Sequence, residues 1–191
     1  NDIAKYSAFG FSFIELALSV YFLARFVPDD LLQFNADYAW IPKLGIYFNV
    51  GIDGISIIPI MLSTILVPLI ILTTFKHVYS KAPVFYALIL FIQAGMLTVF
   101  TALDGFLFYV GWEAALIPIY FISALWGGEN RVRVTLKFFI YTFAGSLFML
   151  GGLIFLYIQN PSRTFDLQEF YQLSLPDAQQ SVLFWTFFLA L

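Results

Sequence analysis

Glu113 is the residue whose position most strongly indicates chemistry. It lies eight residues after Gly105, in a run over about 105–126 that carries no other charge. In a helix that rises about 1.5 Å per residue, this places it about 12 Å into a hydrocarbon core about 30 Å thick. A charged acid at that depth costs about 2.5–3.5 kcal/mol on insertion scales. Glu113 must therefore face protein or water, pair with a cation, or stay protonated, and these conditions favour a proton-relay residue.

Two further residues are candidates to assist such a relay. Pro118 follows Glu113 by five residues and removes the helix hydrogen bond to the carbonyl of Ala114, which predicts a kink just after the acid. Lys137 is expected about 7 Å from one end of its apolar run. It is interpreted either as an anchor whose stem reaches the membrane surface or as a residue of a lateral proton path.

The same residues also allow purely structural explanations. A neutral Glu113 would then only hydrogen-bond one helix to another, and Pro118 would be a packing kink without a role. Glu15, in the first apolar run, either faces a neighbouring helix or reaches the membrane surface. His77 is expected in a solvated loop between two runs.

Several site classes are excluded by what the sequence lacks. The chain has no Cys and one His, which excludes disulfides, thiolate metal sites and iron–sulfur ligation. It has no phosphate-binding loop, no dinucleotide fingerprint and no metal-ligand spacing, so no cofactor or metal is expected in this chain. No Lys/Arg run exists that could follow a phosphate backbone, and no nucleic-acid partner is expected.

Composition points to a membrane as the solvent of this chain. Of its 191 residues 61% are hydrophobic and only 11% are charged, against about 25% charged in soluble domains. We predict an all-α, polytopic transmembrane bundle that forms one domain over residues 1–191, because only helices satisfy their backbone groups in lipid without closing a barrel. Five complete spans and a truncated sixth are expected, at about 7–27, 55–75, 83–103, 105–126, 132–158 and 181–191.

The ends and the loops complete this prediction. The chain begins without Met and its last apolar run is about half a span long, so we expect a piece of a longer protein. Lys and Arg residues gather in alternate loops, which predicts the cytoplasm or its organellar equivalent on that side. In the loop after the first span, two β-prone stretches over 38–41 and 46–50 flank Pro42-Lys-Leu-Gly45, which predicts a short β-hairpin.

Three stretches resemble a known family. Phe108-Tyr-Val-Gly-Trp-Glu-Ala-Ala-Leu-Ile-Pro-Ile-Tyr, running on to Trp126-Gly, is similar to the antiporter-like membrane subunits of respiratory complex I, and to subunit M more than to subunits L and N. Lys137-Phe-Phe-Ile-Tyr-Thr142 and Trp40-Ile-Pro-Lys-Leu-Gly45 carry the same resemblance, which spans about residues 40–158.

The resemblance implies a role in proton-pumping NADH:quinone oxidoreductase, a translocase. Family members have about fourteen helices in two inverted five-helix repeats. Their intramembrane Glu, which Glu113 matches, pairs with a Lys expected here beyond Leu191. NADH, FMN, iron–sulfur clusters and quinone belong to other subunits, so this chain would carry no redox chemistry. The expected partners are the other membrane subunits, especially L and N, and the lipid of a bacterial inner membrane or an organellar inner membrane.

Other functions fit the same sequence features. A subunit of a multisubunit sodium/proton antiporter or of an energy-converting hydrogenase would share the fold and the Trp112-Glu113 helix. A structural membrane scaffold without a proton path would use Glu113 only as a hydrogen bond. A quinone-binding enzyme suits the 20% aromatic content, but aromatic residues are ordinary packing in lipid.

Overall fold

The protein is a bundle of long helices with a two-stranded hairpin at one end. The computed structural model describes residues 2–28, 31–77 and 79–190. Within these residues, five helices are long and apolar enough to cross a membrane, and the last turn of the second is 3-10 helix. They are α1 (Asp2–Arg25), α2 (Ile57–Thr73), α3 (Ala82–Thr101), α4 (Gly105–Trp126) and α5 (Arg131–Gln159). The predicted all-α bundle with five spans is confirmed.

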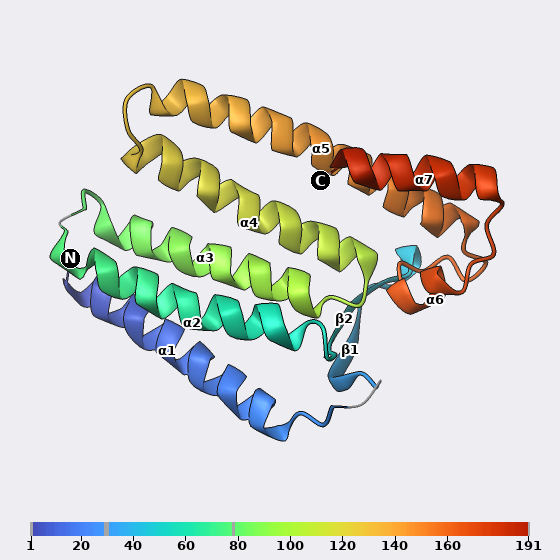
Figure 1. Cartoon of the computed structure of the whole chain (residues 1–191), viewed down its shortest axis with the longest axis horizontal. Helices are drawn as coiled ribbons and strands as arrows, with labels where there is room; N and C mark the ends of the chain where they lie inside the picture. The colour runs from blue at the N-terminus through green and yellow to red at the C-terminus, as the bar shows by residue number, and fades with distance from the viewer. Residues whose placement is uncertain (1, 29–30, 78, 191) are drawn as a thin grey trace.

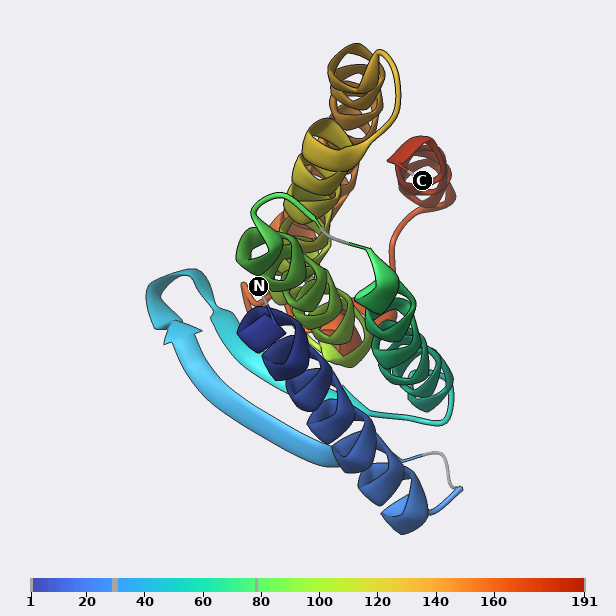
Figure 2. The same cartoon turned by 90° about the vertical axis from the view of Figure 1, so that its left-hand side faces the viewer.

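The long helices run in alternating directions, so their connections gather at two ends (Figure 1). The start of α1, the α2–α3 connection and the α4–α5 connection lie at one end, and with them Lys5, Lys76, Lys81, Arg131 and Arg133. The hairpin and the short helix α6 (Leu167–Tyr171) lie at the other end. Helix α7 (Asp177–Ala190) returns alongside α5 (Figure 2). Helix α1 starts five residues earlier than the apolar run at 7–27 predicts, and α7 four residues earlier than the run at 181–191.

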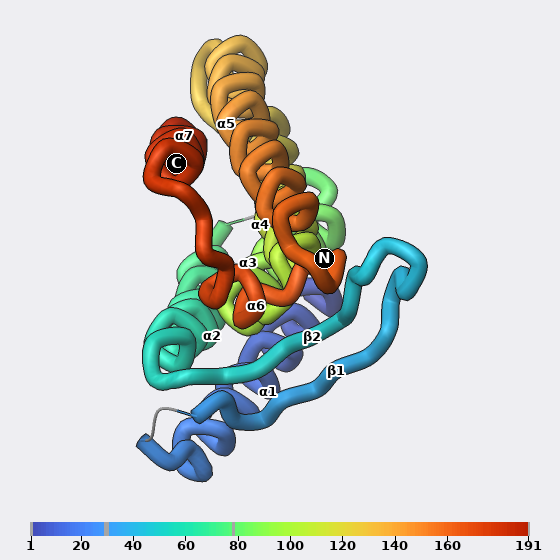
Figure 3. The backbone as a smooth tube through the Cα atoms, turned by 90° about the vertical axis from the view of Figure 1, so that its right-hand side faces the viewer, coloured from blue at the N-terminus to red at the C-terminus, as the bar shows by residue number. Residues whose placement is uncertain are grey.

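The hairpin predicted after the first span is confirmed. Strands β1 (Gln33–Ile41) and β2 (Ile46–Ile52) pair antiparallel, and a 3-10 turn over Pro42–Leu44 joins them. Gly45 closes the turn with φ 62°, a left-handed conformation that costs glycine little. The hairpin lies across one end of the helices (Figure 3).

The connection between α3 and α4 is extended and is hydrogen-bonded to neighbouring segments on both sides. The main-chain N–H of Leu103 donates to Asn49 of β2, and the N–H of Leu167 donates to the carbonyl of Leu103, both at 2.9 Å. The N–H of Gly105 donates to the carbonyl of Phe165 at 2.7 Å. The segment therefore lies as a short strand between β2 and the α5–α6 loop, which fixes where α4 begins.

Candidate functional site

Glu113 is positioned by the way α4 starts. Asp104 is the N-cap of α4, and its Oδ1 accepts hydrogen bonds from the N–H groups of Phe106 and Leu107 at 2.8 and 3.0 Å. Its Oδ2 accepts from the N–H of Tyr47 in β2 at 3.0 Å. One carboxylate therefore satisfies two free N–H groups of the helix start and ties them to the hairpin. Glu113 lies about two turns further into the helix.

The Asp104 carboxylate is itself almost completely buried, with 1% of its surface exposed. Burial raises the pKa of Asp104 above its ordinary value, and hydrogen bonds from Tyr47, Leu107 and Phe106 oppose this rise. Asp104-Gly105 is an ordinary turn sequence, and the long-range hydrogen bond from Tyr47 gives Asp104 a structural role that this sequence does not indicate.

Close packing on α3 sets the rotation of α4 about its axis. A Cβ on Gly111 would lie 2.9 Å from Cγ2 of Thr98, and a Cβ on Gly95 would lie 2.8 Å from the main-chain N of Ala115. Gly111 and Ala115 therefore face α3. Because successive residues of a helix are about 100° apart, Glu113 between them projects to the opposite side of α4.

On that side Glu113 meets Tyr109 and the helix α5. Tyr109 lies one turn before Glu113, and its hydroxyl lies close to Glu113 and to Ser146 of α5, without a direct hydrogen bond to either side chain in the part of the chain that the structure describes. Ser146 is 1% exposed, and its hydroxyl donates to the carbonyl of Phe143 at 2.8 Å. Glu113 itself is only partly exposed, and its Oε1 is buried with no hydrogen-bond partner among the residues the structure describes. The result is an acid in the middle of a span, beside two hydroxyl groups, with unused hydrogen-bonding capacity.

Lys137 lies apart from this group. It is exposed on α5, nine residues before Ser146, which corresponds to about 13 Å along the helix axis. The structure therefore does not bring Lys137 to Glu113. Pro118 is buried inside α4, which remains helical through it from Gly105 to Trp126.

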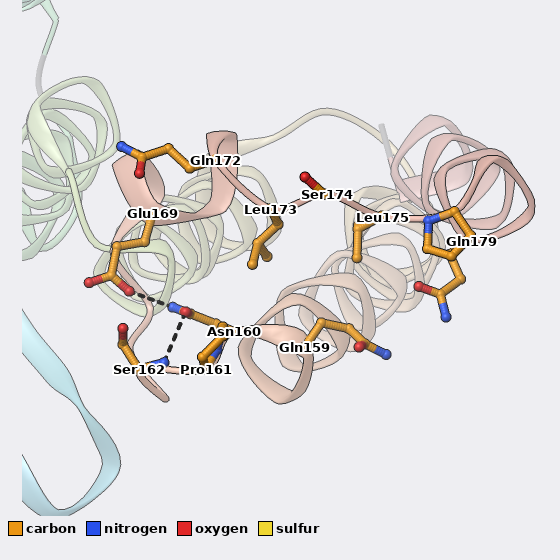
Figure 4. Close-up of a pocket in the computed structure, with 11 residues that line it drawn as sticks. Gln159, Asn160, Pro161, Ser162, Glu169, Gln172, Leu173, Ser174, Leu175 and Gln179 are labelled. Atoms are coloured by element: carbon orange, nitrogen blue, oxygen red, sulfur yellow. Dashed lines mark hydrogen bonds between the residues drawn. The ribbon is translucent and has the colours of Figure 1, made fainter.

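A separate polar hollow of about 650 Å³ lies between the end of α5, α6 and the start of α7 (Figure 4). Glu169 accepts hydrogen bonds there from Asn160 Nδ2 at 2.7 Å and from Thr164 Oγ1 at 2.8 Å. These bonds lower the pKa of Glu169 below its ordinary value. Within residues 2–28, 31–77 and 79–190, no three His, Cys, Asp or Glu side chains are grouped so that they could hold a metal ion.

Two polar residues of the spans were missed by the sequence reasoning. Tyr109 precedes Glu113 by four residues, so the helical period alone places it beside the acid. Gln93 is the one amide side chain in the uncharged run at 83–103, and it is 0% exposed. Both signals were present in the sequence and were hidden by an average over each apolar run.

The comparisons with known proteins bear on this arrangement. Residues 102–191, which include Glu113 and Tyr109, match the family described as NADH:quinone oxidoreductase/Mrp antiporter, transmembrane. The chain is 42% identical over 174 residues to F(420)H(2) dehydrogenase subunit M of Methanosarcina mazei, covering 86% of this chain and 35% of that protein. It is 37% identical over 175 residues to NADH-quinone oxidoreductase subunit M of Rickettsia conorii, covering 90% and 35%. The chain belongs to this family of antiporter-like subunits.

A solved structure of the family agrees over nearly the whole chain. Respiratory complex I from Thermus thermophilus contains a chain that matches with a TM-score of 0.82 and 28% identity, over 94% of this chain and 37% of that one. The Mrp complex of Dietzia sp. matches with a TM-score of 0.79 and 19% identity, over 99% and 23%, which shows a shared fold. The chain spans about 35% of the length of the curated relatives it matches. It is an integral membrane protein of the subunit M type.

Proposed function

We propose that this chain is part of a proton-translocating membrane subunit of a complex I-type quinone oxidoreductase, in which Glu113 loads and releases a proton. The observation that carries the proposal is the state of Glu113. One of its oxygens is buried in the middle of α4 with no hydrogen-bond partner among the described residues, and Tyr109 and Ser146 lie beside it.

The chemistry of this group suits proton transfer rather than redox catalysis. In the low dielectric of a bundle, an ionised carboxylate is costly unless a cation or hydrogen bonds compensate it, so its protonation responds to a nearby charge. The Tyr109 hydroxyl can donate to the carboxylate and accept in turn, which makes it a route for a proton along α4 toward Ser146.

Electron transfer is assigned to other subunits. NADH, FMN, iron–sulfur clusters and quinone would be bound by partner subunits, and the neighbouring membrane subunits would be of the L and N type. Two relatives whose names state subunit M of NADH-quinone oxidoreductase, and the match to a chain of complex I, support this proposal. We expect the protein in a bacterial inner membrane or in an organellar inner membrane, with the Lys/Arg-rich ends of the helices on the negative side.

A cationic partner is expected for Glu113 in the part of the protein outside this chain. Lys137 is exposed and about 13 Å from the level of Glu113, so it does not provide that partner here. Lys137 remains a candidate for a lateral path to a neighbouring subunit, because its side chain is exposed on α5.

One observation favours a complex whose electron donor is F(420)H(2) in place of NADH. The relative from Methanosarcina mazei, at 42% identity, is named for F(420)H(2) rather than NADH. The membrane subunit would work in the same way in both complexes, because the donor binds elsewhere. Co-purification with subunits that oxidise NADH, or with subunits that oxidise F(420)H(2), distinguishes the two. A sodium/proton antiporter would co-purify with neither.

The decisive experiment is Glu113→Gln in the intact complex, reconstituted in closed vesicles. Proton uptake and quinone reduction are measured per NADH oxidised, and reduction of an artificial acceptor shows that the redox subunits remain assembled. We expect acceptor reduction to persist while coupled quinone reduction and proton uptake fall about ten-fold or more, as for loss of a proton-transfer group. Glu129→Gln, at an exposed acid in the α4–α5 connection, is the matched control and should behave as the parent.

If Glu113→Gln kept the parental ratio of protons to electrons, Glu113 would be a structural hydrogen bond in a helical scaffold. The proposal would then be wrong, although the membership of the chain in the family would stand.

A further inference from the structure

Three helices on the far side of the bundle from α5 enclose a second group of buried polar residues. Helices α1, α2 and α3 contact one another and form two apolar clusters. The first lies toward the Lys/Arg-rich end and includes Ala8, Val67, Ile71, Tyr86 and Ile89. The second lies toward the hairpin and includes Phe22, Ile57, Ile60, Leu97 and Phe100.

The layer between these clusters is polar. On each helix, the buried residues that lie between the two clusters and face the other two helices are a serine, a threonine or a glutamine, and each is at most 5% exposed: Ser12, Ser19, Ser63, Thr64 and Gln93. We call these five residues, together with Glu15, the polar layer. A span buries such residues at a cost, so a group of them within about two turns of three adjacent helices indicates a function.

Glu15 belongs to the inward face of α1. Ala8, Ser12, Glu15 and Ser19 are spaced by three and four residues, so they form one stripe on the helix. Ala8, Ser12 and Ser19 are buried and Glu15 is half-buried. Its Oε2 is shielded from solvent and has no hydrogen-bond partner in the part of the chain that the structure describes. Of the two sequence-based interpretations of Glu15, the one in which it faces neighbouring helices agrees with this placement.

Gln93 shows that the layer is incomplete without a ligand or an internal partner. It is 0% exposed, and neither Oε1 nor Nε2 has a hydrogen-bond partner among the described residues. Buried amides are almost always hydrogen-bonded, because an unpaired one loses its water without compensation. The hydrogen bond from Lys5 to Phe75 aligns α1 with the end of α2, and the one between Thr74 and Tyr86 aligns that end with α3. Counting residues along the helices from these contacts places Gln93 at the level of Ser12 to Leu16, within about one helical turn of Glu15.

The hydroxyl groups of the layer determine what it can bind. Each donates its hydrogen to a carbonyl of its own helix: Ser12 to Phe9, Ser19 to Glu15, Ser63 to Ile60 and Thr64 to Ile60, at 2.8–3.0 Å. Their oxygens can then only accept further hydrogen bonds. An ionised carboxylate also only accepts, so it is poorly matched to such surroundings, whereas a protonated carboxyl group and an amide NH₂ can donate.

No side-chain cation of these helices is placed to neutralise Glu15. The spans of α2 and α3 carry no charged residue between Ile57 and Thr73 or between Ala82 and Thr101. On α1, Lys5 and Arg25 are each ten residues from Glu15, about 15 Å along the axis. Lys5 donates to the carbonyl of Phe75 at 2.8 Å, and Arg25 lies over the ring of Tyr21.

We propose that the polar layer is an intramembrane proton-binding site, in which a protonated Glu15 is hydrogen-bonded to Gln93 directly or through water. The proton is carried on the carboxyl group of Glu15, whose O–H donates to an oxygen of the layer, and the Gln93 NH₂ donates to the remaining acceptors. Gln93 is the positioning residue. This site is separate from Glu113, which lies between α4 and α5, and it does not depend on Glu113 being a relay.

Infrared difference spectroscopy of the intact, membrane-reconstituted complex tests the proposal without relying on pumping. A protonated carboxyl group has a C=O stretching band that shifts when H₂O is replaced by D₂O. We expect Glu15→Gln to remove one such band at neutral pH, and Gln93→Met, which keeps the volume but removes the amide, to shift that band. Glu129→Gln is the control at an exposed acid and should leave the band unchanged.

Glu15→Asp keeps the acid if Glu15→Gln does not assemble, and we expect it to displace the band rather than remove it. A spectrum at neutral pH in which neither change at Glu15 alters any protonated-carboxyl band would overturn the proposal. A band that is unaffected by Gln93→Met would remove Gln93 from the site. A band that disappears when sodium replaces potassium would show that the layer holds a metal cation in place of the proton, which also contradicts the proposal.

Discussion

The main-chain N–H of Tyr47 donates to Oδ2 of Asp104 at 3.0 Å, across 57 residues of sequence. The other carboxylate oxygen caps α4 through Phe106 and Leu107. A single buried acid therefore joins the hairpin outside the spans to the helix that carries Glu113. The depth of Glu113 and the position of the hairpin are coupled through it.

Removal of this carboxylate should destabilise the hairpin end of the bundle. Asp104→Ala leaves the N–H groups of Tyr47, Phe106 and Leu107 without their acceptor, and we expect a loss of about 2–4 kcal/mol of stability. Asp104→Asn keeps a carbonyl acceptor, so its stability should lie between that of Asp104→Ala and that of the parent. Thermal denaturation of the purified complex measures the effect, with Asp37→Ala, at an exposed acid of β1, as control. Equal melting of Asp104→Ala and Asp37→Ala would contradict the role of the cap.

Acid should weaken the network around Glu169. Hydrogen bonds from Asn160 and Thr164 lower the pKa of this carboxyl group, so its ionised form favours the folded state. That contribution is present above the pKa of the unfolded chain and is lost as the pH falls through the lower folded value. Asp104 acts in the opposite sense, because its pKa is raised and protonation relieves its burial.

We therefore expect Glu169→Gln to flatten part of the decline of thermal stability at acidic pH. Melting temperatures of the complex over a pH series measure this, with Asp177→Asn, at an acid outside the network, as the comparison. A parental pH profile in Glu169→Gln would mean that the two hydrogen bonds contribute nothing measurable.

Helix α7 should depend on one glycine of α5 and not on its neighbour. A Cβ on Gly152 would lie 2.8 Å from Cζ of Phe187, whereas a Cβ on Gly151 would meet nothing within 4 Å. Both substitutions have the same intrinsic effect on the helix, so the pair isolates packing. We expect Gly152→Leu to cost about 1–3 kcal/mol more than Gly151→Leu, measured by thermal denaturation and by yield of assembled complex. Equal effects would show that α7 does not pack on α5 through Gly152.

The sequence was sufficient for the features that depend on local pattern. Apolar runs predicted the five spans because lipid requires a helix of a certain length, and Pro42-Lys-Leu-Gly45 between β-prone stretches predicted the hairpin. The place of Glu113 near the middle of α4 followed from the bounds of its apolar run. Each of these inferences uses neighbours within one element.

Features that depend on the register between elements were not predictable in this way. The α3–α4 connection is fixed by main-chain hydrogen bonds to segments about 50 to 60 residues away in the sequence, such as the bond from Leu103 to Asn49. The polar layer appears only when the inward faces of three helices are placed side by side. The sequence shows Gln93 as the one amide of an uncharged run, but its complete burial and its unpaired amide are known only from the structure.

Tyr109 should affect coupling through its hydroxyl group. Tyr109→Phe keeps the ring but removes the hydroxyl that lies close to Glu113 and Ser146. We expect coupled quinone reduction and proton uptake to slow together by about three- to ten-fold, because a hydrogen-bonded route becomes longer while Glu113 itself remains. The assay is that of Glu113→Gln, with reduction of an artificial acceptor as the check on assembly. Tyr141→Phe removes a hydroxyl from an exposed tyrosine of α5, 74% exposed, and should be neutral. Parental coupling in Tyr109→Phe would exclude Tyr109 from the proton route, and Ser146 and water would then have to supply the hydrogen bonds to Glu113.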